Sequence, residues 1–105
     1  MKKLFIIAVL LASNALANAK EYTIIIKNHK FSPETIEVPV GEAVKLIIDN
    51  QDPTAEEFES HSLHREKIIQ GNSSAIIYVG PLEAGEYAFF GEFNEATAQG
   101  LLIAK

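Results

Sequence analysis

The sequence contains no cysteine among its 105 residues. This absence excludes disulfides, thiolate-bound metals, iron–sulfur clusters, cysteine nucleophiles and a lipid anchor on an N-terminal cysteine. Basic residues are also scarce, since 9 Lys and Arg stand against 14 Asp and Glu and give a formal net charge of −5. A nucleic-acid partner requires clustered Lys and Arg, so we expect none. The hydrophobic fraction of 48% at this length is that of one globular domain.

Sequence motifs of enzymes are missing as well. No serine lies in a G-x-S-x-G sequence, the glycines are spaced as turn residues rather than as a phosphate-binding loop, and no pair of carboxylates has a spacing that predicts a catalytic cleft. We therefore expect a protein without enzymatic activity.

The N-terminal segment has the pattern of a cleaved secretory signal peptide. Two lysines precede an apolar run of nine residues, and two A-x-A sequences, which signal peptidase reads, end at Ala17 and Ala19. A membrane span needs about 20 apolar residues, so this run is too short for one. We predict a signal peptide over residues 1–19 with cleavage after Ala17 or Ala19, and a mature domain over residues 20–105. This domain is expected in the periplasm, without a membrane span after cleavage.

The rest of the sequence consists of short runs with the composition of β-strands, spaced about every ten residues. These runs are 22–26, 36–40, 44–48, 75–79, 87–90 and 101–104. Gly and Pro between them mark turns. Pro39 has no backbone N–H to donate, which favours an edge strand. We predict an all-β Greek-key β-sandwich of seven to eight strands.

Two longer segments interrupt this spacing. Residues 51–67 are polar and acidic and hold two of the three histidines, and residues 91–100 connect the last two strands by more than a tight hairpin needs. Long connections on a small sandwich often carry function.

The order of these motifs resembles the cupredoxins. Phe31–Gly41 (FSPETIEVPVG) and the run ending at Asn50 (LIIDN) are similar to the opening strands of that family, and Pro81–Phe90 (PLEAGEYAFF) resembles the strand before its metal loop. Glu56–Ile69 and Phe90–Gly100 are more specifically similar to EfeO-type cupredoxin-like domains. The resemblance implies a cupredoxin-like sandwich that serves as a metal-handling accessory of bacterial iron or copper uptake. It also implies a periplasmic iron-binding protein or a membrane iron permease as the partner.

The resemblance assigns the four ligand positions of a blue-copper site, and each position holds another residue. The two histidine positions fall at Glu56 and Asn94, the cysteine position at Gly91, and the axial methionine position near Ala98. A type 1 copper centre needs one thiolate and two imidazoles. We therefore predict that no type 1 copper centre forms.

Other carboxylates and imidazoles are candidate metal ligands. If the segment around them is extended, Glu57, Glu59 and His61 share one face and Glu56 lies on the other. The last long loop should bring a further carboxylate to the same end of the sandwich. We predict that a divalent ion such as Cu or Fe is bound by Glu56, His61, His64 and Glu92.

Other interpretations of the acidic segment stay open. Its pattern is also typical of a solvated strand with incidental histidines. A different class of function is a protein-interaction module with a decayed metal site, in which residues 52–66 dock a basic partner and act mainly on the association rate. A third interpretation is electron transfer through another copper arrangement.

Overall fold

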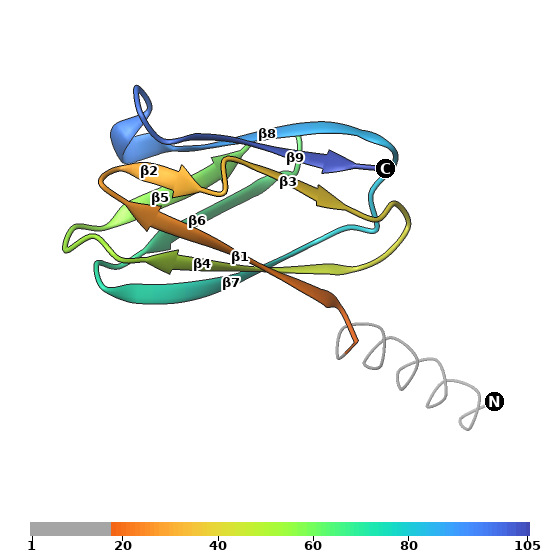
Figure 1. Cartoon of the computed structure of the whole chain (residues 1–105), viewed down its shortest axis with the longest axis horizontal. Helices are drawn as coiled ribbons and strands as arrows, with labels where there is room; N and C mark the ends of the chain where they lie inside the picture. Colours follow the sequence, from red (N-terminus) through yellow and green to blue (C-terminus); the bar gives the residue numbers. More distant parts are fainter. Residues whose placement is uncertain (1–17) are drawn as a thin grey trace.

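A computed structural model describes residues 18–105, which form nine strands and one short 3₁₀ helix (Figure 1). The predicted signal peptide covers residues 1–19, of which 1–17 lie outside the described residues. The elements are β1 (Lys20–Lys27), β2 (Lys30–Ser32), β3 (Thr35–Val38), β4 (Val44–Asn50), β5 (Glu56–Ser60), β6 (Arg65–Ile69), β7 (Ser73–Val79), β8 (Gly85–Gly91), η1 (Glu92–Asn94) and β9 (Gln99–Ala104).

The nine strands form two sheets that pack against each other (Figure 1). One sheet has the order β2-β1-β4-β7, and the other has the order β3-β9-β8-β5-β6. β1 pairs with β4 and β3 with β9 in parallel, and the other neighbours are antiparallel. The predicted all-β sandwich is confirmed. β3 lies at the edge of its sheet, as the proline at position 39 predicted.

The core lies between the two sheets and follows from the alternation of apolar residues along the strands. Every second residue of β4 is buried, beginning with Val44. The rings of Phe31, Phe58 and Phe89 meet at centroid distances of 5.1 to 6.3 Å. Such aromatic pairs add about 0.5–1.5 kcal/mol each beyond the burial of their surface. Phe89 lies opposite Gly100 of β9, and a Cβ atom at position 100 would overlap the Phe89 ring, so only glycine fits there.

A buried asparagine fixes the connection that leads into β5. Nδ2 of Asn50 donates to the carbonyl oxygens of Thr54 at 2.9 Å and Ile69 at 3.2 Å, and its Oδ1 accepts from the backbone N–H of Asp52 at 3.1 Å. The side chain therefore ties the end of β4 to the start of β5 and the end of β6. This contact places the acidic residues of β5 at one end of the sandwich.

Segment 51–67, singled out in the sequence as a long connection, contains β5 and the start of β6. These two strands were not predicted, because polar residues occupy most of their positions. Among residues 18–105, no helix has the length and apolar character that crossing a membrane requires.

Candidate metal centre

The four positions that the resemblance matches to a blue-copper site are neighbours in space. Glu56 begins β5, Gly91 ends β8, Asn94 ends η1, and Ala98 precedes β9. A Cβ atom at position 91 would lie 2.7 Å from Cδ of Glu56 and 2.8 Å from Cβ of Ala98. The residues found at these positions therefore decide what this end of the sandwich can bind.

The Glu56 side chain fills the space between β5 and the loop after β8. The residue is 2% exposed, and its carboxylate accepts three hydrogen bonds. Oε1 accepts from the backbone N–H groups of Glu57 at 2.9 Å and Phe93 at 2.8 Å. Oε2 accepts from Nδ2 of Asn94 at 2.7 Å. Hydrogen bonds to an ionised acceptor are roughly twice as strong as those between neutral groups. Both oxygens of this predicted ligand are thus engaged in joining the loop to β5.

This network has consequences for copper chemistry. A carboxylate and an amide stand where a blue-copper site has two imidazoles. The carboxyl group of Glu56 also lies where the side chain of a cysteine at position 91 would begin. Because the sequence contains no cysteine, it supplies no thiolate for a type 1 copper site.

Four glutamates converge on the outward face of the five-stranded sheet, which contains β5, β6 and β8, and form a four-carboxylate cluster. Its members are Glu57, Glu59, Glu66 and Glu92, and one carboxylate oxygen of each lies within 4.8 Å of those of the others. Glu57 and Glu59 alternate along β5, Glu66 lies directly opposite Glu59 on β6, and Glu92 follows the end of β8. Like charges directly opposite each other destabilise a sheet. The cluster is therefore unfavourable for folding unless protons or a cation reduce the repulsion.

Glu57 is the buried member of the cluster. It is 7% exposed, and its Oε1 has no hydrogen-bond partner among the described residues. Most buried polar atoms are hydrogen-bonded, and one that is not costs about 1–3 kcal/mol, or more when the group is charged. A buried carboxylate with an unpaired oxygen, in a cluster with three other carboxylates, is a group that a cation would stabilise.

The proximity of the carboxylates shifts the pKa values of Glu57, Glu59 and Glu92, and not all in the same direction. A hydrogen bond with the Glu92 carboxyl, burial, and the charges of Glu66, Glu92 and Glu59 raise the pKa of Glu57 to about 7. Burial and a hydrogen bond with Glu92 raise the pKa of Glu59. Hydrogen bonds with Glu57 and Glu59 lower the pKa of Glu92, because they stabilise its charged form. Near neutral pH the Glu57 carboxyl of the folded protein is therefore protonated in a substantial fraction of the molecules.

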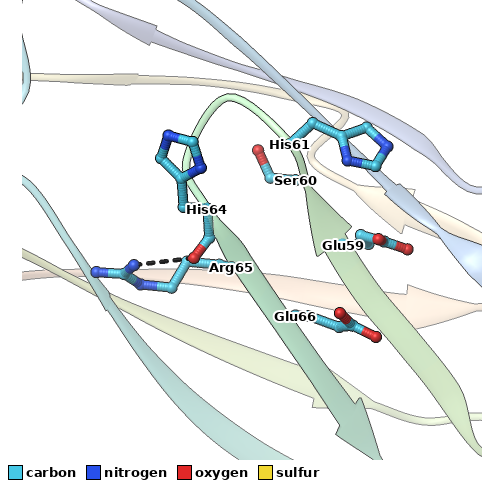
Figure 2. Close-up of a pocket in the computed structure, with 6 residues that line it drawn as sticks. All are labelled: Glu59, Ser60, His61, His64, Arg65 and Glu66. Atoms are coloured by element: carbon cyan, nitrogen blue, oxygen red, sulfur yellow. Dashed lines mark hydrogen bonds between the residues drawn. The ribbon is translucent and has the colours of Figure 1, made fainter.

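The two predicted histidines lie at the turn between β5 and β6, beside a shallow pocket of about 390 Å³. Figure 2 shows their rings apart from each other on the two arms of this turn. The imidazole of His61 lies 5.5 Å from the Phe90 ring, between centroids. His64 has a φ of 55°, and its carbonyl oxygen accepts a hydrogen bond from Nη1 of Arg65 at 3.0 Å (Figure 2). Within residues 18–105, neither imidazole joins the group of convergent carboxylates.

The structure separates the four predicted ligands. Glu92 belongs to the four-carboxylate cluster, whereas Glu56 is buried in the hydrogen-bond network behind it. His61 lies near enough that a positive charge on its ring would oppose the rise in the pKa of Glu59 and add to the fall in that of Glu92, and His64 lies in the turn. The sequence had predicted that Glu57 and Glu59 share one face if their segment is extended. The fourth member, on β6, was missed because its pairing with β5 depends on a turn that the sequence does not mark.

Two packed sheets, with a loop after β8 that meets the start of β5, define a cupredoxin-type sandwich. The model of the cupredoxin-like domain family matches residues 2–104, and this chain belongs to that family. The uncharacterized protein RP394 of Rickettsia prowazekii (strain Madrid E) is 51% identical over 86 residues, which cover 82% of this chain and 69% of that protein.

Solved structures with the same fold include copper proteins. Auracyanin A, a "blue" copper protein from Chloroflexus aurantiacus, has a TM-score of 0.72 at 13% identity and covers 84% of this chain and 100% of its own. The metal-binding domain of the Cu(I)-exporting P-type ATPase CopA of Streptococcus pneumoniae D39, solved with Cu(I), also has a TM-score of 0.72, at 15% identity. That match covers 81% of this chain and 84% of the CopA domain. At these identities the likeness shows the fold alone.

Proposed function

We propose that this chain is a secreted, non-enzymatic metal-handling accessory of bacterial iron or copper uptake, of the EfeO type, which works in the periplasm without a blue-copper site. The resemblance of Glu56–Ile69 and Phe90–Gly100 to EfeO-type domains and the signal-peptide pattern of the N-terminus support this role. Such a role implies a periplasmic iron-binding protein or a membrane iron permease as the partner.

The four-carboxylate cluster is the observation that carries the proposal. A divalent cation held by Glu57, Glu59, Glu66 and Glu92 would give the buried Oε1 of Glu57 the partner that it lacks. The ion pairs of residues 18–105 lie elsewhere, so no Lys or Arg of this region neutralises the cluster. Carboxylate oxygens suit hard cations, whereas Cu(I) prefers thiolate or thioether sulfur. The donor set therefore favours Fe(II) or Mn(II) over Cu(I).

Calorimetric titration tests the cation site. Wild-type protein is titrated with Mn(II), anaerobic Fe(II) and Cu(II), beside Glu57→Gln and the control Glu86→Gln. Glu86 is an exposed residue of β8 outside the cluster, so its substitution removes the same charge at a distance. We expect Glu57→Gln to weaken binding of Mn(II) and Fe(II) at least about tenfold, since even groups behind metal ligands typically contribute that much. Equal affinities of Glu57→Gln and wild type would exclude the cluster as the site.

The copper spectrum tests the absence of a blue-copper site. Added Cu(II) meets only oxygen and nitrogen donors, so its complex should lack the intense blue absorption of a copper–thiolate bond. Intense blue absorption by the purified protein would contradict the proposal.

The hydrogen-bond network of Glu56 favours a second candidate function, a protein-interaction module with a decayed metal site. Glu56 offers a metal no free oxygen, and the amide of Asn94 donates to it. In that case the acidic segment 52–66 would dock a basic partner. Wild-type protein that binds none of the three cations at sub-millimolar concentration would favour this module over the metal-handling role.

A further inference from the structure

The three hydrogen bonds that Glu56 accepts come from residues in or next to the four-carboxylate cluster. One donor is the backbone N–H of Glu57, the buried cluster member. The other two are the backbone N–H of Phe93 and the side-chain amide of Asn94, the two residues that follow Glu92. A single buried carboxylate therefore connects the backbone that carries Glu57 to the turn that carries Glu92.

The sheet itself does little to hold these two cluster members together. The pairing of β5 with β8 consists of Phe58 with Gly91 and Glu59 with Phe90, and it stops before Glu57 and Glu92. Apart from the carboxyl contacts of the cluster, the hydrogen bonds from residues 92–98 to β5 within the described chain both end on Glu56. The remaining hydrogen bonds of this loop close it on itself or onto its neighbours.

We propose that Glu56 and Asn94 are positioning residues of the cation site, which set the separation of Glu57 and Glu92 from behind the cluster. This inference rests on the cation-binding function proposed above. Neither residue contacts the cation. Ligands must be held within about 0.5 Å of their binding geometry, and residues that support them typically change metal affinity by about 10–100-fold when they are replaced.

Asn94→Ala removes the Glu56–Asn94 hydrogen bond without changing the charge, so it separates this role from a general need for a negative charge. Reversing the polarity of the bond then tests whether the connection itself can be rebuilt. In Glu56→Gln, one side-chain oxygen still accepts from the two backbone N–H groups, but Asn94 loses its charged acceptor. The new Gln amide faces the Asn94 amide, so the connection keeps a weaker, neutral hydrogen bond only if the Asn94 amide turns over to present its oxygen. Adding Asn94→Asp supplies an acceptor to the Gln amide and restores the net charge. The double variant therefore rebuilds the connection with its donor and acceptor exchanged.

The experiment measures Mn(II) affinity by calorimetry for wild type, Glu56→Gln, Asn94→Ala and Glu56→Gln/Asn94→Asp. Amide hydrogen exchange of Phe93 in the metal-free protein reports the connection directly. Glu57→Gln serves as the ligand variant. Val44→Ala creates a cavity beside β4 of the other sheet. It serves as a control that loses stability without touching the hydrogen bonds of Glu56.

We expect each of the two single variants to bind Mn(II) about tenfold more weakly or worse, with faster exchange at Phe93. The double variant should return both quantities to near the wild-type values. Wild-type affinity in Asn94→Ala, with weak binding in Glu57→Gln, would refute the positioning role and leave the proposed function standing. Equal weakening in Val44→Ala, or no recovery in the double variant, would also refute it. A wild type that binds no cation overturns both the function and this inference.

Discussion

Replacing Gly91 by alanine tests whether the position equivalent to the cupredoxin cysteine has room for a side chain. The backbone at Gly91 is extended, with φ −96° and ψ 110°, so alanine needs no unusual conformation there. Its Cβ, however, would lie 2.7 Å from Cδ of Glu56 and 2.8 Å from Cβ of Ala98. The Glu56 carboxyl is held by three hydrogen bonds and the Ala98 methyl is fixed to the backbone, so neither moves without cost.

The size of the effect follows from comparison with a second glycine of the same strand. At Gly85 the nearest atom to a new Cβ is Cε1 of Tyr87 at 3.8 Å, an ordinary contact. Both alanine substitutions restrict the unfolded chain, which stabilises the protein by about 0.4–1 kcal/mol and cancels between them. Overpacking at Gly91 costs about 1–3 kcal/mol. We therefore expect Gly91→Ala to be about 1–3 kcal/mol less stable than Gly85→Ala.

Urea unfolding of the two variants and wild type measures this difference. With an m value of about 2 kcal/mol/M, a difference of about 2 kcal/mol separates the midpoints by about 1 M. The m values should agree, since the substitutions leave the exposed surface of the unfolded chain unchanged. If the two variants unfold within about 0.5 kcal/mol of each other, which is the range of neutral surface substitutions, the space at position 91 is not filled as described.

Three further predictions concern pH, the buried Asp52 that accepts hydrogen bonds from a turn, and maturation. The unfolded-state pKa of Glu57 is 4.5 and the folded value is about 7. Between these values the folded state holds a proton that the unfolded state has lost, so wild-type stability falls as the pH rises. The melting temperature of Glu57→Gln minus that of wild type should therefore increase from pH 4.5 to pH 7.5. A difference that stays constant over this range would contradict the raised pKa of Glu57. Burial alone would raise the pKa of Asp52, but backbone hydrogen bonds from the β1–β2 turn lower it below 3.8. Asp52→Asn should thus lose about 1–3 kcal/mol at pH 7 in urea unfolding, and this loss should shrink below pH 3.8. If Asp52→Asn is as stable as wild type at pH 7, the stabilising role of these hydrogen bonds is refuted. Mass spectrometry of exported protein should find a mature N-terminus at Asn18 or Lys20, and a chain that keeps its initiator methionine would contradict secretion.

The sequence predicted the parts of the fold in which one face of a strand is apolar. The alternation from Val44 to Ile48 marked β4, and Pro39 marked the edge next to β3. It did not predict β6, whose first four residues are all exposed and carry no apolar alternation. Where neither face of a strand is clearly apolar, hydrophobic periodicity gives no signal.

The candidate site was predictable only along a single strand. Extended backbone puts Glu57 and Glu59 on one face, and the sequence suffices for that step. Glu66 joins them because a turn of four residues, from His61 to His64, folds β6 back onto β5. Whether Glu56 binds a metal or accepts hydrogen bonds depends on donors 37 and 38 residues away. No pattern within one segment of sequence contains that information.

The position of β9 in its sheet affects the order in which the chain can fold. β9 is the last strand in chain order, yet it lies between β3 and β8 and joins the early half of the protein to the late half. Until residues 99–104 are in place, β3 lacks its one partner in the described sheet, and β8 has only its two-residue pairing with β5. Pairings between distant segments also form slowly. The chain should therefore stay without a complete second sheet until β9 pairs, and a truncation before Gln99 would divide that sheet rather than shorten its edge.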